Sequence, residues 1–138
     1  MKFPTYPIPA VAAVIEEQGQ VLLVKRGVEP SKGRWSLPGG KIELGEPFKV
    51  ALQREIREEL QVEIEVQNLY AVKEYIEHDE DGAIKWHYII LDFRCKLLSG
   101  PPTASSDALE VTWVRPEDLI EMRLTRTTRE LLKDKFPS

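Results

Sequence analysis

The sequence has little of what marks a secreted, membrane or nucleic-acid-binding protein. Its single cysteine, Cys95, excludes an intramolecular disulfide and a multi-cysteine zinc site. No apolar run approaches the roughly 20 residues that a transmembrane helix needs, and the N-terminus has no apolar secretory segment. The net charge is only −4, which argues against a broad basic surface for a nucleic-acid polymer. We therefore expect a cytoplasmic protein without a membrane or nucleic-acid partner.

The composition that remains is that of an ordinary globular domain. Hydrophobic residues make up 42% and charged residues 30% of 138 residues, which suits one hydrophobic core and leaves little room for a second. No internal repeat or linker divides the chain. The sequence therefore predicts a single domain over residues 1–138.

The charges are unevenly distributed along the chain. From Lys25 to Lys41 five bases stand against one acid, whereas from Glu43 to Glu65 seven acids stand against three bases. A cationic loop that leads into an anionic helix is typical of a site that handles phosphate through a metal ion. Two solvated surfaces of opposite sign are the alternative, and charge alone does not decide between them.

Hydrophobic periodicity predicts strands, a helix, further strands and a last helical region. The segment 47–60 contains no internal Gly or Pro, places apolar residues four apart, and has Pro47 at a position that suits the first helical turn. A capping box at Thr127–Glu130 opens the last helix. The other expected elements are strands at 10–15, 21–24, 62–66, 69–76, 86–98 and 111–114 and a short helix at 116–122. This order predicts an α/β fold in which helices cover both faces of a mixed sheet.

Three carboxylates in the predicted helix carry the main chemical signal. At about 100° per residue, Glu55, Glu58 and Glu59 share one helix face. Like charges at these spacings destabilise a helix unless a cation compensates them. Carboxylate oxygens suit Mg²⁺ or Mn²⁺, and both ions commonly share the phosphates of a substrate. For such a short motif alone, an ordinary charged surface remains the better interpretation.

The motif is longer than this, and the longer pattern resembles the Nudix box. It runs from Gly40 through Glu46 and Arg54-Glu55 to Glu58-Glu59 and ends at Val62, so that the box covers 40–62. Six such positions would arise by chance in a chain of this length on the order of 10⁻⁶ to 10⁻⁵ of the time. Segments 21–26 and 35–40 also look like the strand and loop that precede the box in the family. The resemblance implies a Nudix α/β/α sandwich, a mixed sheet between helices.

The resemblance also implies a function and a set of site residues. Family members are hydrolases that cleave nucleoside diphosphates linked to another moiety, with water and Mg²⁺ or Mn²⁺. By resemblance, the metal would be held by Glu58, Glu59, the carbonyl of Gly39 and Glu55, which is alternatively the general base. The catalytic set would be Glu55, Glu58, Glu59 and Arg54. Gly40 and Glu46 would support it, with Glu46 and Arg54 orienting the carboxylates.

Several assignments outside the box stay open. Arg26 corresponds to a position that can contact substrate phosphate, although a solvated strand end is nearly as good an interpretation. The general base can come from a later loop, where Asp107 and Glu110 are candidates, and Glu110 is also a candidate for substrate binding. His87 fits a packed strand position better than a catalytic one.

The box departs from the family pattern at one position and leaves the substrate undecided. Gln61 stands where relatives have a glycine, so the helix lacks the usual residue for a left-handed C-cap. The proline and tyrosine markers of the ADP-ribose and diadenosine-polyphosphate groups are both missing. We favour an ADP-ribose-type substrate, with an oxidised nucleoside triphosphate or a non-catalytic nucleotide-binding module as alternatives. A homodimer is possible.

Overall fold

The computed structural model describes residues 4–135 and contains one mixed sheet with helices. Its elements, in chain order, are β1 (Ile8–Glu17), β2 (Gln20–Arg26), β3 (Trp35–Ser36), β4 (Gly39–Lys41), α1 (Phe48–Leu60), β5 (Ile64–His78), β6 (Ile84–Leu97), β7 (Ala108–Val114), the 3₁₀ helix η1 (Pro116–Glu121) and α2 (Arg126–Lys135). Within this part of the chain, no helix has both the length and the apolar character needed to cross a membrane.

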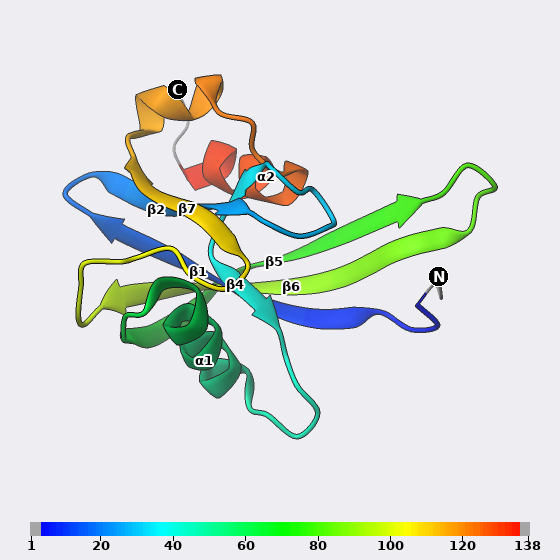
Figure 1. Ribbon diagram of the computed structural model, residues 1–138, viewed down its shortest axis with the longest axis horizontal. Helices are drawn as coiled ribbons and strands as arrows, with labels where there is room; N and C mark the ends of the chain where they lie inside the picture. The colour runs from blue at the N-terminus through cyan, green and yellow to red at the C-terminus, as the bar shows by residue number, and fades with distance from the viewer. Residues whose placement is uncertain (1–3, 136–138) are drawn as a thin grey trace.

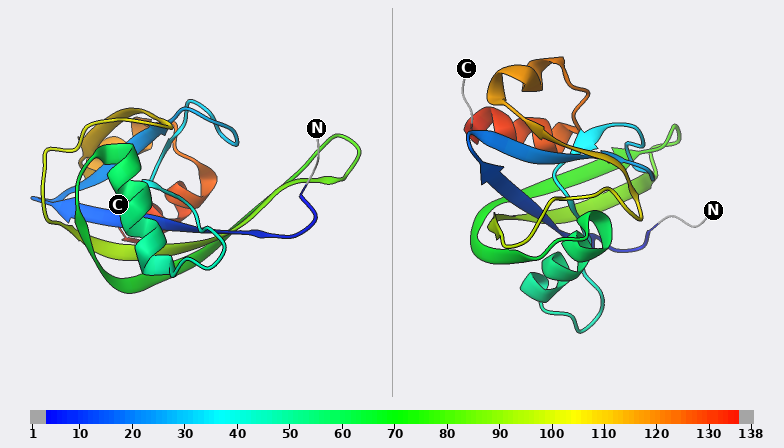
Figure 2. Two further views of the ribbon diagram at one scale, coloured as in Figure 1. Left: turned by 60° about the horizontal axis from the view of Figure 1, so that its bottom comes forward. Right: turned by 60° about the vertical axis from the view of Figure 1, so that its left-hand side comes forward.

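The central strand of the sheet is β1. It pairs in parallel with β6 and antiparallel with β4 and β2, which gives the order β3-β2-β1-β6-β5, with β4 added to β1 and β7 to β2. In Figure 1, α1 lies below this sheet and α2 lies above it. The right-hand view in Figure 2 shows the same arrangement. The predicted α/β/α sandwich, a single domain with a mixed sheet between helices, is confirmed.

Alternate side chains of β1 supply the two hydrophobic cores. Val11, Ala13 and Ile15 pack into the core that contains α1, and Ala12 and Val14 pack into the core that contains α2. This alternation follows from the two-residue period of a strand. Because β1 is apolar on both faces, it can lie between the two helical layers.

Helix α1 follows its predicted apolar stripe. Leu52, Ile56 and Leu60 are fully buried, whereas Phe48 at the exposed start stacks on Phe93 with ring centroids 5.3 Å apart. Pro47 is the N-cap residue, one position before the helical turn in which we expected it. At the other end Gln61 takes the left-handed conformation, with φ 58° and ψ 36°. A non-glycine residue therefore forms the left-handed cap that a glycine usually provides.

The segments 62–66 and 69–76 form one strand, not two. Strand β5 is continuous and follows β6 through irregular pairing at three places, one of which lies where the sequence led us to expect a break. The two strands turn between Asp79 and Ala83, where the Asp79 N–H donates to the Ala83 carbonyl at 2.8 Å. The hairpin projects from the body of the molecule (Figures 1 and 2).

The start of α2 differs from the predicted capping box. Thr125, not Thr127, is the capping residue, because its Oγ1 accepts a hydrogen bond from the Thr128 N–H at 3.3 Å. The same Oγ1 donates to Thr128 Oγ1 at 2.8 Å. The Thr128 hydroxyl in turn accepts from the Leu37 N–H at 3.3 Å, which joins the helix start to the loop before β4.

Candidate active site

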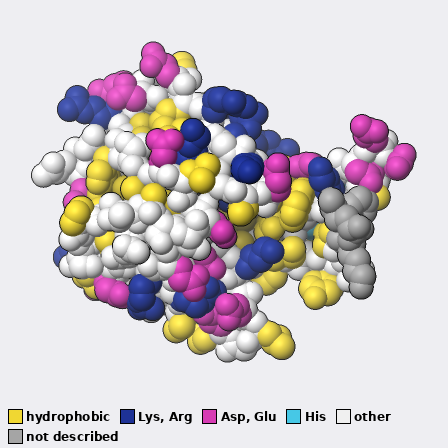
Figure 3. Space-filling model, viewed as in Figure 1, with side chains coloured by type: hydrophobic (Ala, Val, Ile, Leu, Met, Phe, Trp, Pro, Cys, Tyr) yellow, Lys and Arg dark blue, Asp and Glu magenta, His cyan; other side chains and the backbone are white. Residues whose placement is uncertain are grey.

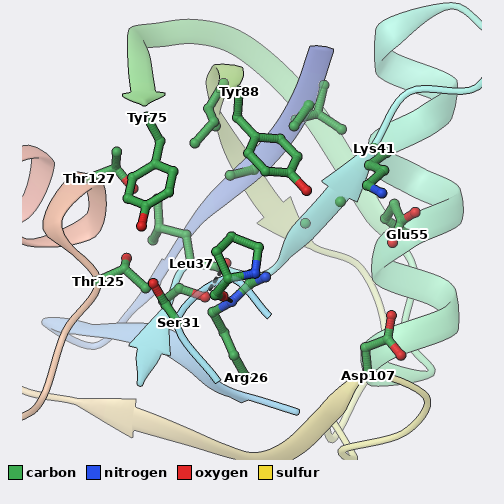
Figure 4. Close-up of a pocket in the computed structure, with 18 of the residues that line it drawn as sticks. Arg26, Ser31, Leu37, Lys41, Glu55, Tyr75, Tyr88, Asp107, Thr125 and Thr127 are labelled. Atoms are coloured by element: carbon green, nitrogen blue, oxygen red, sulfur yellow. Dashed lines mark hydrogen bonds between the residues drawn. The ribbon is translucent and has the colours of Figure 1, made fainter. Parts of the chain in front are cut away.

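A cavity of about 650 Å³ lies beside the sheet, bordered by the second half of α1 and the start of α2. Its wall includes the box residues Gly39, Gly40, Arg54, Glu55, Glu58 and Glu59. Figure 4 shows Glu55 and Lys41 on one side of the cavity and Tyr75 and Thr127 on the other. The carboxylates predicted to share a helix face therefore line one pocket.

Arg54 connects the carboxylates around it. Its guanidinium donates two hydrogen bonds to Glu46, from Nε at 2.7 Å and from Nη2 at 2.9 Å. It also donates from Nη1 to Glu55 at 2.9 Å and to both oxygens of Glu58 at 3.3 Å, and from Nη2 to the Lys41 carbonyl at 3.1 Å. The bond to Arg54 is the main reason that the pKa of Glu46 falls to about 2. Acidic and basic side chains lie next to one another over α1 in Figure 3.

Glu59 is the most deeply buried of the three carboxylates. Only 8% of the residue is exposed, and its Oε1 accepts a hydrogen bond from the Gly39 N–H at 2.8 Å. Burial raises the pKa of Glu59 to about 8, with smaller contributions from the negative charges of Glu55 and Asp107. The Gly39 N–H and the positive charge of Arg26 act in the opposite direction. Burial is also the largest cause of the raised pKa of Glu55.

The two glycines of β4 are required by close approach and not by a positive φ. A Cβ on Gly39 would overlap the Val11 carbonyl, and a Cβ on Gly40 would overlap the Glu55 carboxyl group. Neither residue has a positive φ, and both lie in the extended strand β4. The absence of these side chains lets β4 lie against both β1 and the Glu55 carboxylate.

The chemistry of this donor set fits a divalent cation. Glu55, Glu58 and Glu59 supply the hard oxygen ligands that Mg²⁺ prefers, and they line one pocket. Within residues 4–135, no group of three or more His, Cys, Asp or Glu side chains is arranged to hold a metal ion. In this conformation Arg54 bonds Glu55 and Glu58, while the Gly39 N–H bonds Glu59.

The structure separates the predicted residues outside the helix. Arg26 lines the cavity, where its Nε donates to the Pro30 carbonyl at 2.7 Å. Asp107 lines it too, whereas Glu110 is not among the lining residues described and pairs with Lys25 at 3.3 Å. The Glu110 side chain is 58% exposed in β7. Of the two later-loop candidates for the general base, Asp107 is the one that the fold brings to the carboxylates.

Other pocket residues were missed by the sequence analysis or given no role in it. Tyr88 and Asp92 lie on β6, and Thr125 and Thr128 lie at the start of α2. Asp92 had a visible signal, because it is the charged residue in the otherwise apolar run from Ile89 to Phe93. No sequence signal marked the two threonines, because their place in the pocket depends on how α2 packs against the sheet.

These features define the class of protein: an α/β/α sandwich with a carboxylate-bearing helix beside a pocket. The NUDIX domain model matches residues 5–135. The chain is 36% identical over 131 residues to a "Nucleoside triphosphatase NudI" from Enterobacter sp. (strain 638), covering 86% of this chain and 89% of that protein. It is 37% identical over 111 residues to an "ADP-ribose pyrophosphatase" from Methanocaldococcus jannaschii, covering 79% of this chain but only 63% of that protein.

The solved structures give the same result. A MutT NUDIX hydrolase from Burkholderia pseudomallei superposes with a TM-score of 0.82 at 31% identity, covering 96% of this chain and 99% of that one. The chain therefore belongs to the Nudix family, and it is a hydrolase of that family. The resemblance drawn from the box is confirmed.

Proposed function

We propose that this enzyme is a Mg²⁺- or Mn²⁺-dependent hydrolase that cleaves the pyrophosphate bond of a nucleoside diphosphate linked to another moiety. One observation carries the proposal: Glu55, Glu58 and Glu59 line one pocket, together with the Arg54 guanidinium that bonds Glu55 and Glu58. Glu55, Glu58, Glu59 and the Gly39 carbonyl would hold the metal. A bound metal ion offsets phosphate charge and lowers the pKa of its water.

The chain's own residues would position the substrate and accept the proton. Arg26 lies at the wall of the cavity, where its guanidinium can neutralise and orient a phosphate group. Glu55 and Asp107 are the candidates to accept the proton from the attacking water. Arg54, fixed by its bidentate bond to Glu46, holds Glu55 in one orientation. Substrate binding by Glu110 stays a prediction, as does a cytoplasmic location.

An ADP-ribose-type substrate remains our first choice. The relative named for ADP-ribose supports it, and the relative named as a nucleoside triphosphatase supports the alternative of a nucleoside triphosphate. A non-catalytic binding module is disfavoured because all the box carboxylates are present. We also keep the homodimer as a proposal, for which exposed apolar residues of β5 (Leu69, Val72 and Ile76) offer a surface.

A substrate panel tests the proposal. Phosphate-product release would be measured for ADP-ribose, sugar nucleotides, diadenosine polyphosphates, NADH, and canonical and oxidised nucleoside triphosphates, with Mg²⁺, with Mn²⁺ and with chelator. We expect metal-dependent cleavage with the highest kcat/KM for ADP-ribose. Preference for an oxidised triphosphate would overturn the substrate, and silence from folded, metal-supplied protein would overturn the activity.

A pair of variants tests the role of the box. Glu58→Gln is expected to abolish turnover while the far-ultraviolet circular dichroism stays unchanged, because an amide is a poor ligand for a hard cation. Glu63→Gln is the matched control, since Glu63 pairs with Arg57 and is not among the described residues that line the cavity. Near-normal turnover by a folded Glu58→Gln protein would defeat the metal assignment.

A further inference from the structure

Asp92 is a buried acid at the wall of the cavity for which the proposed hydrolysis has no use. It lies on β6, where it is directly opposite Ala12 of β1 and Ala71 of β5. The residue is 3% exposed, yet it lines the cavity together with Tyr88 and Ile90 of the same strand. By the two-residue period of a strand, these three side chains share the face of the sheet that borders the cavity.

Nothing in the described chain satisfies this carboxyl group. Within residues 4–135, no hydrogen bond and no ion pair to Asp92 is found, and its carboxyl oxygens are not among the fully buried atoms without a partner, so they keep a small exposed area. Its register neighbours are the methyl groups of Ala12 and Ala71, and the charge of Lys73 on β5 only partly offsets the burial that raises the pKa of Asp92 to about 7. Burying a carboxyl group without a hydrogen-bond partner destabilises the protein. A ligand that donates a hydrogen bond to this group would therefore gain binding free energy.

The position of Asp92 relative to the carboxylate helix suits the base of a nucleotide. Gly39, whose N–H bonds Glu59, pairs with Ala12, and Ala12 pairs with Asp92 on the next strand. Asp92 is therefore two strand spacings, about 10 Å, from Gly39 across the sheet. A nucleoside spans such a distance between its 5′ phosphate and its base. The small side chains of Ala10 and Ala12 leave room above the sheet between these two points.

The cavity also has faces for an aromatic ring, four residues, or about 13 Å, along β6 from Asp92. Tyr75 and Tyr88 are directly opposite each other on β5 and β6, and both line the cavity. In Figure 4 they lie across the cavity from Arg26. Tyrosine rings stack on any base, so they supply affinity and little selectivity. Selectivity among bases must then come from a polar group that reads the edge of the base.

We propose that Asp92 accepts a hydrogen bond from the exocyclic amino group of the substrate's base, so that the enzyme selects adenine- or guanine-type bases over hypoxanthine. A carboxyl group keeps at least one acceptor oxygen in either protonation state, so the amino group always finds a partner. Hypoxanthine has no exocyclic amino group and therefore cannot make this hydrogen bond. This inference rests on the proposed function, because it assumes a nucleotide substrate.

The test compares substrate pairs that differ in the amino group. The wild-type protein with Mg²⁺ would be assayed on ADP-ribose against inosine-diphosphate ribose, and on ATP and GTP against ITP. We expect the amino-bearing member to have the higher kcat/KM by ~10- to 100-fold, the value of one hydrogen bond to a charged or buried acid. Isothermal titration calorimetry with chelator would measure the same preference as a ratio of affinities, without turnover.

Two variants connect the preference to this residue. Asp92→Leu is expected to remove the preference, so that the two members of each substrate pair have equal kcat/KM and equal affinity. Asp92→Asn, which keeps the shape, is expected to weaken the preference between adenine and hypoxanthine, because an amide can accept from the amino group or donate to the oxygen that replaces it. If the leucine variant does not fold, the asparagine variant carries the test.

The possible failures are distinguishable. Hydrolysis of the panel without any preference for the amino-bearing member, or a preference that both variants retain, would overturn the role of Asp92 and leave the hydrolase standing. The absence of metal-dependent hydrolysis would overturn the proposed function, and the affinity ratio from calorimetry would still decide the inference. Equal affinities for ADP-ribose and inosine-diphosphate ribose would overturn the inference in either case.

Discussion

Replacing Arg54 by lysine tests whether its guanidinium organises the carboxylates. A lysine keeps the charge but has one ammonium group, which cannot bond Glu46 twice and also reach Glu55. Charge-assisted hydrogen bonds are each worth about 1.5–3 kcal/mol when buried, and the Arg54 side chain is 22% exposed. After a discount for solvent screening, we expect the substitution to lower the free energy of unfolding by about 2 kcal/mol.

The expected effect on activity is larger than that on stability. Because Glu55 would lose the donor that orients it, we expect kcat/KM to fall by about 100-fold, the scale of a misplaced catalytic group. Urea denaturation would measure the stability, and hydrolysis of the best panel substrate would measure kcat/KM.

Arg57→Lys is a matched control on the same helix. Arg57 also bonds a glutamate twice, donating to Glu63 at 2.7 and 2.9 Å, but its side chain is 55% exposed and it is not among the described residues that line the cavity. We expect this variant to retain wild-type stability and activity within error. Equal losses in the two variants would refute the reasoning, since that result would assign the effect to arginine–glutamate pairing in general.

Two further predictions concern residues at the cavity wall. Gly40→Ala is expected to lower kcat/KM by at least about 10-fold, with the fold retained by circular dichroism, because the new methyl group would displace the Glu55 carboxyl; wild-type kinetics would contradict this close approach. Asp92→Asn is expected to become more stable relative to wild type as pH rises. The native pKa of Asp92, about 7 against an ordinary value of 3.8, means that the wild type loses up to about 4 kcal/mol of stability between pH 4 and pH 8 that the variant keeps. Urea midpoints across this range would measure the difference, and a pH-independent difference would count against it.

The sequence was sufficient to predict the helix and the residues that share its face. Its strict four-residue apolar spacing sets which side of α1 is buried, and that choice also determines where Glu55, Glu58 and Glu59 point. The contacts of Arg54 with Glu46 and Glu55 follow from the same short segment. Local sequence therefore determines the carboxylate half of the site.

The other half of the cavity depends on long-range pairing that local patterns do not reveal. Asp92 reaches the wall through its register with β1, and Thr125 reaches it through the docking of α2. No local signal in the sequence shows that Glu110 pairs with Lys25. Only the β2–β7 register places the two residues side by side. The apolar pattern of β5 is interrupted because this strand pairs irregularly with β6. The sequence therefore predicted two strands where there is one.

The parallel pairing of β1 with β6 also has a consequence for synthesis of the chain. Ile8 pairs with Tyr88 and Ile15 with Cys95. The central strand β1 therefore cannot pair with β6 until about 80 further residues have been translated. Closing so long a loop makes the nucleus entropically expensive and folding slow. While the chain is still on the ribosome, β1 can pair with β2 and β4, but the part of the cavity wall that β6 supplies is missing. The pocket is therefore completed only after β6, and then the later segments that carry Asp107 and the start of α2, have left the exit tunnel.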